Sequence, residues 1–223
     1  MVESIENELD KIETAFTDVN SLRELGFWKF VSKIKRDEKL RQTLSDRAGR
    51  IERKAFENTI KLRVNLLTGN LIMAGFTISG ILAIAVSLTC TSEAIRSYSI
   101  IAASLILSFS LHPLTHYVVG KLSGINFLYY FPDGPARIEP SLKVDYTTYL
   151  KASQKRRAIM HLSGVIATIL AALFCLLVGI SLDIYGWAKG ALFFYFVILF
   201  LSDSLMSKKY GDIKRFKREL NLL

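Results

Sequence analysis

Two histidines four residues apart, His112 and His116, are the side chains of this chain best suited to chemistry. They lie in the run His112-Pro113-Leu114-Thr115-His116, inside an apolar stretch of the sequence. Residues four apart on a helix share one face on adjacent turns, about 6 Å apart along the axis at 1.5 Å per residue. With that spacing a helix offers two imidazole nitrogens to one zinc ion. The pair therefore predicts a metal site, with zinc as the expected ion.

The elements that must position this pair are membrane helices. Hydrophobic residues make up 51% of the 223 residues and charged residues 22%, and the two kinds are segregated along the chain. A transmembrane helix needs about 20 consecutive apolar residues. Four runs are long enough, namely Leu66–Thr89, Tyr98–Val119, Ala158–Ser181 and Gly186–Leu205. We expect an all-α polytopic membrane protein with four transmembrane helices in a domain over 66–205.

The basic residues predict how these helices are oriented. The link between the first two runs contains only Arg96 as a cation, and the only cation near the link between the last two is Lys189, at the start of the fourth run. The remaining cations of the membrane part gather in the 120–157 link and in the basic tail over 206–223. Since basic loops stay on the cytoplasmic side, both termini are expected to be cytoplasmic. The net charge of +9 then matches anionic lipid head groups rather than nucleic acid, because no basic motif interleaved with aromatic residues accompanies it.

Residues 1–65 are expected to form a cytoplasmic helical segment. Its apolar residues recur at steps of three and four, first at Val2, Ile5, Leu9, Ile12, Phe16 and Val19, then at Leu40, Leu44, Ala48, Ile51, Ala55 and Leu62. Such helices can pack on one another or on the membrane surface. They can also form a coiled coil that binds a partner or makes a homo-oligomer, although the first seam covers under three heptads.

Further candidate ligands lie at the same predicted depth as the histidine pair. Three polar residues in different runs each lie four or five positions from a cation that must stay in water. These pairs are His116 and Lys121, Asp203 and Lys208, and His161 and Arg157. If the segments are helical, the three groups lie about 6–8 Å inside one cytoplasmic boundary. Asp203 and His161 are therefore candidate metal ligands beside the pair.

The segment 112–125, His-Pro-Leu-Thr-His-Tyr-Val-Val-Gly-Lys-Leu-Ser-Gly-Ile, resembles the zinc helix of the site-2-protease-like intramembrane metalloproteases. That helix runs His-Glu-x-x-His and is commonly followed, eight residues after the second His, by Gly and an aliphatic residue; Gly124-Ile125 match that place. The resemblance covers about 100–210. It implies that Asp203, in a later transmembrane helix, is the third zinc ligand. It also places Gly164 and Thr168 where the family often has a Gly-Pro-x-x-Asn motif.

Three departures from the family pattern bear on activity. Pro113 replaces the Glu that activates the zinc-bound water, so no catalytic residue is expected. Ser204 follows Asp203 where the family usually has Gly. His161 is an additional candidate that the family does not require, and with it the site would be four-coordinate and closed.

The sequence thus leads to one preferred function and two alternatives. The preferred function is a metal-binding membrane protein that is impaired in proteolysis and that binds or regulates transmembrane client proteins. The first alternative is an active, atypical zinc endopeptidase that uses another base. The second is a metal-independent membrane scaffold. The 120–157 link, with Tyr129-Tyr130-Phe131-Pro132-Asp133-Gly134-Pro135, suits an interfacial loop or a hairpin.

Overall fold

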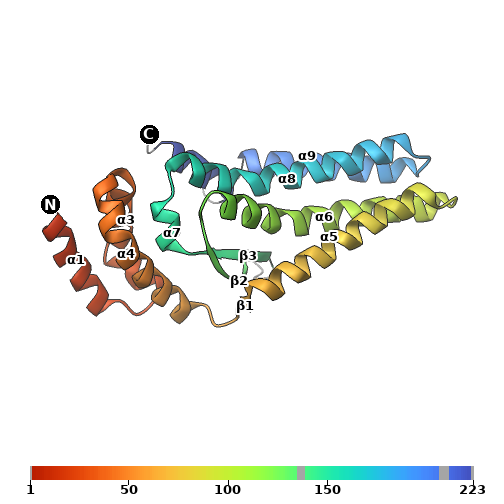
Figure 1. Cartoon of the computed structure of the whole chain (residues 1–223). Coiled ribbons are helices and arrows are strands. Elements are labelled where there is room, and N and C mark those ends of the chain that lie inside the picture. The colour runs from red at the N-terminus through yellow and green to blue at the C-terminus, as the bar shows by residue number, and fades with distance from the viewer. Residues whose placement is uncertain (1, 135–138, 206–210, 222–223) are drawn as a thin grey trace. The chain divides into compact units, whose positions relative to one another are not determined.

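The structure is a computed structural model that describes residues 2–134, 139–205 and 211–221, and side chains within these ranges except those of 2–5 and 203–205. It is mostly helical, as Figure 1 shows. The chain divides into two compact units. The first contains Met1–Leu66, Gly120–Arg157 and Glu219–Leu223, and the second contains Leu67–Val119 and Ala158–Arg218.

The first unit contains five helices among the described residues: α1 (Val2–Ala15), α2 (Val19–Glu24), α3 (Phe27–Arg36), α4 (Glu38–Thr59) and α7 (Tyr146–Lys151). Polar residues cap the N-termini of three of them, α2, α4 and α7. Asp18 and Ser21 form a reciprocal capping box at α2, and the Asp37 carboxylate accepts a hydrogen bond from the Leu40 backbone at 3.1 Å to cap α4. The predicted helical character of the N-terminal segment is therefore confirmed.

Most described residues of the apolar stripes are buried inside the unit itself, whereas Leu62, predicted to continue the second stripe, lies beyond the end of α4 and is 68% exposed. Leu9 and Ile12 of α1 are 0% and 3% exposed. The stripe on α4 is also buried, at Leu40, Leu44, Ala48, Ile51 and Ala55. Removing such side chains from water is the main source of stability in a small helical unit. The stripes thus pack against other residues of the same chain, and a homo-oligomer through them stays a prediction.

A small antiparallel sheet corrects the all-α expectation. Its strands are β1 (Val64–Asn65), β2 (Phe127–Asp133) and β3 (Glu139–Val144), in the order β1-β2-β3. The hairpin that the aromatic link suggested is therefore present, and Gly134 follows β2 with φ of 79°. β1 occupies part of the connection between α4 and the first apolar helix, so α4 does not continue into that helix.

Ion pairs are buried in the interior of the first unit. The Glu219 carboxylate, 0% exposed, accepts hydrogen bonds from Lys35, from Arg157 Nε at 2.6 Å and from the Tyr149 hydroxyl at 2.9 Å. Charges removed from water in this way are tolerated only when they are paired and hydrogen-bonded. Glu219 is therefore a fixed attachment point for the C-terminal end of the chain within this unit.

The second unit is built from long apolar helices. They are α5 (Leu66–Thr89), α6 (Glu93–Leu122), α8 (Gln154–Ser181) and α9 (Gly186–Leu205), together with most of α10 (Asp212–Leu220). Three of them, α5, α6 and α8, are long and apolar enough to cross a membrane. α9 has the predicted bounds and is apolar too, and the part of it whose side chains are described, Gly186–Ser202, is shorter than a full span. α5 has the bounds that the sequence predicted.

Small and medium side chains hold these helices together. Ile100 and Ala103 of α6, Cys175 of α8 and Ala188 of α9 belong to one core cluster and are each 0% exposed. Large apolar residues point outward instead, among them Leu71, Ile81, Leu170, Phe174, Phe193 and Phe194. Close packing of small residues with apolar side chains turned outward is typical of helices surrounded by lipid. The second unit is thus a helical membrane-like bundle.

Candidate metal centre

The helix that carries both histidines, α6, ends at a well-defined cap. Gly124 lies just beyond it with φ of +77°, a conformation that favours glycine. The amide of Ile125 donates to the carbonyl of Gly120 at 2.8 Å, and the amide of Gly124 donates to that of Lys121 at 3.0 Å. This is the hydrogen-bond pattern of a Schellman motif. Gly124-Ile125 thus has a local structural role, and α6 itself runs unbroken through Pro113.

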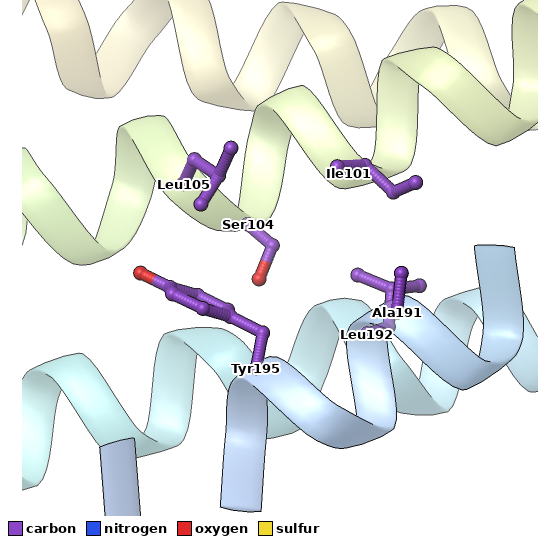
Figure 2. A pocket seen from close by; sticks show the side chains of 6 residues that line it. All are labelled: Ile101, Ser104, Leu105, Ala191, Leu192 and Tyr195. Atoms are coloured by element: carbon purple, nitrogen blue, oxygen red, sulfur yellow. The ribbon is translucent and has the colours of Figure 1, made fainter. Parts of the chain in front are cut away.

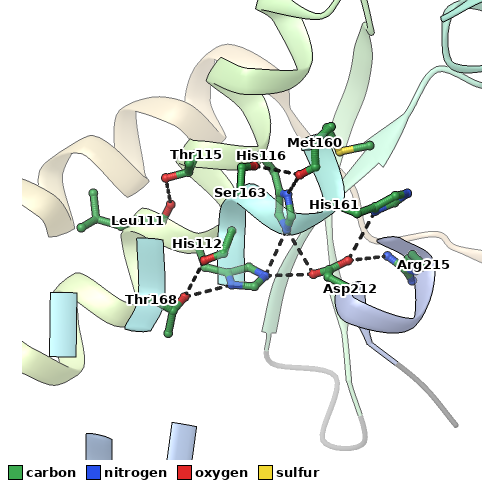
Figure 3. Close-up of polar contacts among 11 residues, drawn as sticks. Leu111, His112, Thr115, His116, Met160, His161, Ser163, Thr168, Asp212 and Arg215 are labelled. Atoms are coloured by element: carbon green, nitrogen blue, oxygen red, sulfur yellow. Dashed lines mark hydrogen bonds and ion pairs between the residues drawn. The ribbon is translucent and has the colours of Figure 1, made fainter. Parts of the chain in front are cut away.

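Three ligand-type atoms meet at one point in the second unit. His112 Nε2 lies 3.2 Å from His116 Nε2 and 3.2 Å from Asp212 Oδ2. His116 Nε2 lies 3.1 Å from the same Oδ2. Figure 3 shows the two imidazoles of α6 turned toward the carboxylate at the start of α10. The prediction that the two histidines share one face is therefore confirmed, and they converge on an acid.

The opposite nitrogen of each ring fixes the tautomer. His116 Nδ1 lies 2.6 Å from the carbonyl oxygen of Met160, which can only accept a hydrogen bond. His112 Nδ1 lies 3.0 Å from Thr168 Oγ1, whose own proton is donated to the carbonyl of Gly164 at 3.0 Å. With these partners the proton is assigned to Nδ1 of both rings. In a neutral ring with this tautomer, Nε2 carries a lone pair, which is directed at the point where the three ligand-type atoms meet.

Close approach of α8 to α6 supports this geometry. A Cβ atom on Gly164 would lie 2.4 Å from His116 Nε2 and 2.7 Å from Cε1 of the same ring. Only glycine leaves room there for the imidazole. Gly164 and Thr168, one turn apart on α8, thus set the positions of both rings.

The carboxylate of Asp212 is held on both oxygens. Oδ2 faces the histidine pair, whereas Oδ1 lies 3.5 Å from His161 Nδ1 and 3.3 Å from Arg215 Nη1. Burial alone would raise the pKa of this carboxyl group, but the hydrogen bonds that His112, His116 and His161 donate to it when their rings are protonated outweigh burial and hold the pKa well below its usual range. Asp212 is therefore ionised. His161 touches the outer oxygen rather than the point where the three ligand atoms meet.

Three electron-pair donors at such distances need a cation between them. A proton shared by one imidazole and the carboxylate is one solution, and a metal ion is the other. Zinc ligands at about 2.0–2.1 Å in a tetrahedron are about 3.3–3.4 Å from one another, close to the spacing of these three atoms. His112, His116 and Asp212 therefore fit one face of a zinc tetrahedron. The His112 side chain is 36% exposed, so the cluster is only partly enclosed by the described residues.

Sequence reasoning placed the acid elsewhere. Asp203 belongs to α9, but its side chain lies outside the described residues, so its role as third ligand stays a prediction. Asp212 was missed. The available signal was its place in the tail, where Asp212 and Glu219 are the two acids among the cations of 206–223. Asp212 is half-buried and contacts the histidines, and Glu219 is buried and contacts Lys35 and Arg157.

The cavities of the second unit contain fewer groups that could bind a metal or transfer a proton than this cluster does. One of about 180 Å³ lies between α6 and α9 and is shown in Figure 2. Its six lining residues are Ile101, Ser104, Leu105, Ala191, Leu192 and Tyr195. They include hydroxyl groups but no acid and no histidine. The metal-type chemistry is thus found at the His112–His116–Asp212 cluster.

Comparisons of the chain with models of protein families, with curated proteins and with solved structures find no match.

Proposed function

We propose that this chain is an integral membrane protein that binds zinc through His112, His116 and Asp212. One observation carries the proposal: Nε2 of both imidazoles and Oδ2 of the carboxylate lie within 3.2 Å of one another. The bonds from Nδ1 to Thr168 and Met160 add the outer contacts that orient histidine ligands in metal sites.

In this proposal α9 is the fourth span beside α5, α6 and α8, and both termini are cytoplasmic. The cations support this orientation, because they gather in the 120–157 link and the tail. The metal then lies near the cytoplasmic ends of the spans. His116 is five residues from Lys121, which must reach water.

The proposed activity is binding or regulation of transmembrane client proteins, with proteolysis impaired. A catalytic zinc site needs a base near the metal-bound water, and Pro113 occupies the position after the first histidine. One observation favours the alternative of an atypical endopeptidase. His161 contacts the outer oxygen of Asp212, so among the side chains that the structure describes three ligands leave a coordination position open, as in catalytic zinc sites.

The test is the metal content of the purified protein, measured by mass spectrometry after removal of loosely bound ions. Wild type is expected to hold about one zinc per chain, and the His112→Ala/His116→Ala variant none. Asp212→Asn keeps the shape but removes the charge and is expected to lose most of the zinc. Asp203→Asn tests the acid that was inferred from the sequence, as opposed to Asp212, which the structure places at the cluster. This variant is expected to keep its zinc.

Thr115→Ala is the matched control. Thr115 lies between the two histidines on α6, but its hydroxyl donates to the carbonyl of Leu111 at 2.7 Å, away from the cluster. A wild-type protein without stoichiometric metal would overturn the proposal and favour a scaffold in which the cluster shares a proton.

A further inference from the structure

The helix that supplies Asp212 has two opposite faces of opposite charge. At 100° per residue, Lys214, Lys217 and Arg218 fall within an arc of about 100° on α10. All three are exposed. The other side of the helix carries both acids and the apolar residues Ile213, Phe216 and Leu220, which are half-buried. α10 is therefore an amphipathic helix whose outer face is purely cationic.

Contacts of the inner face fix which side points outward. Asp212 meets the histidine cluster within 3.2 Å, and Glu219, seven residues later on the same side, is 0% exposed. Arg215 lies at the edge between the faces, 3.3 Å from Asp212 Oδ1, with 53% of its side chain exposed. The cations of the outer face thus cannot turn inward without breaking these contacts.

The place of α10 in the chain identifies what its outer face meets. It follows the apolar helix α9, and residues 206–218 contain six cations and one acid. Within the second unit, Asp212 contacts α6 within two turns of its end at Leu122. A cluster of Lys and Arg next to a membrane helix is attracted to anionic head groups, and each such cation strengthens binding about fivefold.

We propose that the outer face of α10, formed by Lys214, Lys217 and Arg218, binds the head groups of anionic phospholipids, and that this contact holds Asp212 against the histidine pair. The surface itself is independent of the metal. The effect of this lipid contact on zinc affinity rests on the proposed function, because Asp212, the proposed ligand, belongs to the first turn of α10. Loss of the lipid contact frees the first turn of α10, and the site then has only its two histidines.

The test uses the full-length protein in nanodiscs of phosphatidylcholine, with or without about a quarter of phosphatidylglycerol. Hydrogen exchange of the α10 amides is measured without metal. Exchange is expected to slow about tenfold or more in the anionic discs, because three cations are neutralised there. In the Lys214→Gln/Lys217→Gln/Arg218→Gln variant, exchange is expected to be equal in the two lipids. Inorganic phosphate added to the neutral discs is expected to give no protection.

A matched control carries the same charge change on another helix. Lys29→Gln/Lys33→Gln/Arg36→Gln removes three exposed cations from α3 and is expected to retain the lipid dependence of α10. Wild-type α10 exchange that is independent of lipid charge would overturn the inference, whatever the folding of the variants. Protection by phosphate alone would overturn the membrane contact in favour of a free anion.

Zinc affinity in the same discs distinguishes this inference from the proposed function. Tighter zinc binding in anionic discs is the expected result. Zinc binding of equal strength in both lipids would contradict the link between lipid binding and zinc affinity, but would be consistent with the proposed metal site. Lipid-dependent exchange with no zinc binding in either disc would contradict the metal site and leave the lipid-binding face.

Discussion

Gly164 of α8 lies directly against the imidazole of His116, so closely that a Cβ atom there would be 2.4 Å from Nε2. That nitrogen is the atom that faces Asp212 Oδ2 at 3.1 Å. The absence of a side chain at one position thus determines whether a ligand on the neighbouring helix reaches its place. The proposed metal site is therefore a property of the α6–α8 packing as much as of the histidines.

Gly164→Ala is expected to lower zinc affinity by more than tenfold, because the methyl group must displace the His116 ring by an ångström or more. The measurement is competition with a fluorescent zinc chelator in detergent. Gly190→Ala is the control, since Gly190 is also helical but has no atom within 4 Å of the added Cβ. Unchanged zinc affinity in Gly164→Ala would show that His116 does not bind the ion in this rotamer.

Thr168→Val is expected to weaken zinc binding about 10- to 100-fold, because the outer contact of a histidine ligand sets its tautomer and orientation. Valine keeps the shape of threonine but cannot accept the proton of His112 Nδ1. Thr168→Ser restores the acceptor and is expected to recover most of the affinity. Equal binding by the valine and serine variants would mean that the 3.0 Å contact between Thr168 and His112 does not orient the ring.

The sequence predicted the histidine pair correctly because the signal is local. A spacing of four on an apolar helix brings His112 and His116 onto one face whatever surrounds them. The bounds of α5 were predicted for a similar reason. Its apolar run follows Arg63 and is continuous from Leu66 to Thr89, and lipid-facing helices contain few polar interruptions.

The acid of the cluster could not be predicted in the same way. Asp212 reaches the pair only because α10 docks with its acidic side inward, and that depends on contacts about 50 and 100 residues away in the chain. The pairing of β1 with the hairpin was missed for a similar reason. β1 has only two residues, Val64 and Asn65, and pairs with Tyr130 and Tyr129 of β2. Such a strand has no periodicity of its own, since its pairing is set by a distant segment.

The orientation of the bundle can be read from a native thiol. Cys90 lies between α5 and α6 and is half-buried, whereas Cys175 is buried in the core of the bundle. If both termini are cytoplasmic, a membrane-impermeant maleimide is expected to label Cys90 in intact cells. Cys90→Ala is the control that should abolish labelling. A thiol that reacts only after the membrane is permeabilised would place the α5–α6 link in the cytoplasm and reverse the topology.

Glu219→Gln is expected to destabilise the first unit by about 3 kcal/mol at neutral pH. Burial alone would raise the pKa of this carboxyl group, but Lys35 and Arg157 outweigh it and lower the pKa from 4.5 to about 2. A lowered folded-state pKa means that the stabilisation is present above pH 4.5 and is lost as the pH falls through 2. The difference in unfolding free energy between wild type and variant should therefore shrink over that window.

Asp46→Asn provides the comparison for this measurement. Asp46 pairs with Lys151 at 2.7 Å, but its side chain is 53% exposed, so the expected loss is under about 1 kcal/mol. Hydrogen exchange of the amides of α3 and α7 reports the unfolding of this unit. Equal losses for the two variants would mean that the buried pairs of Glu219 contribute no more than a surface pair.

The purified protein is expected to cleave transmembrane peptides poorly even when zinc is bound. A metal ion lowers the pKa of its bound water by itself, but the absence of a base within hydrogen-bond reach costs about 10²- to 10⁴-fold in rate. Pro113 has no proton acceptor, and the nearby carboxylate of Asp212 faces both histidines and is committed to the cluster. The measurement is cleavage of a labelled transmembrane peptide in nanodiscs, with and without a chelator.

Pro113→Glu supplies a carboxylate at the position after His112 and is expected to raise any residual cleavage. Pro113→Ala is its matched control, because it removes the ring without adding a base and so separates the backbone change from the chemistry. A wild-type protein that cuts the peptide at the rate of an ordinary zinc protease, and loses this activity on chelation, would show that the open coordination position is used catalytically. The base would then have to be a group other than the residue at 113, and His161, beside the outer oxygen of Asp212, would be the first to substitute.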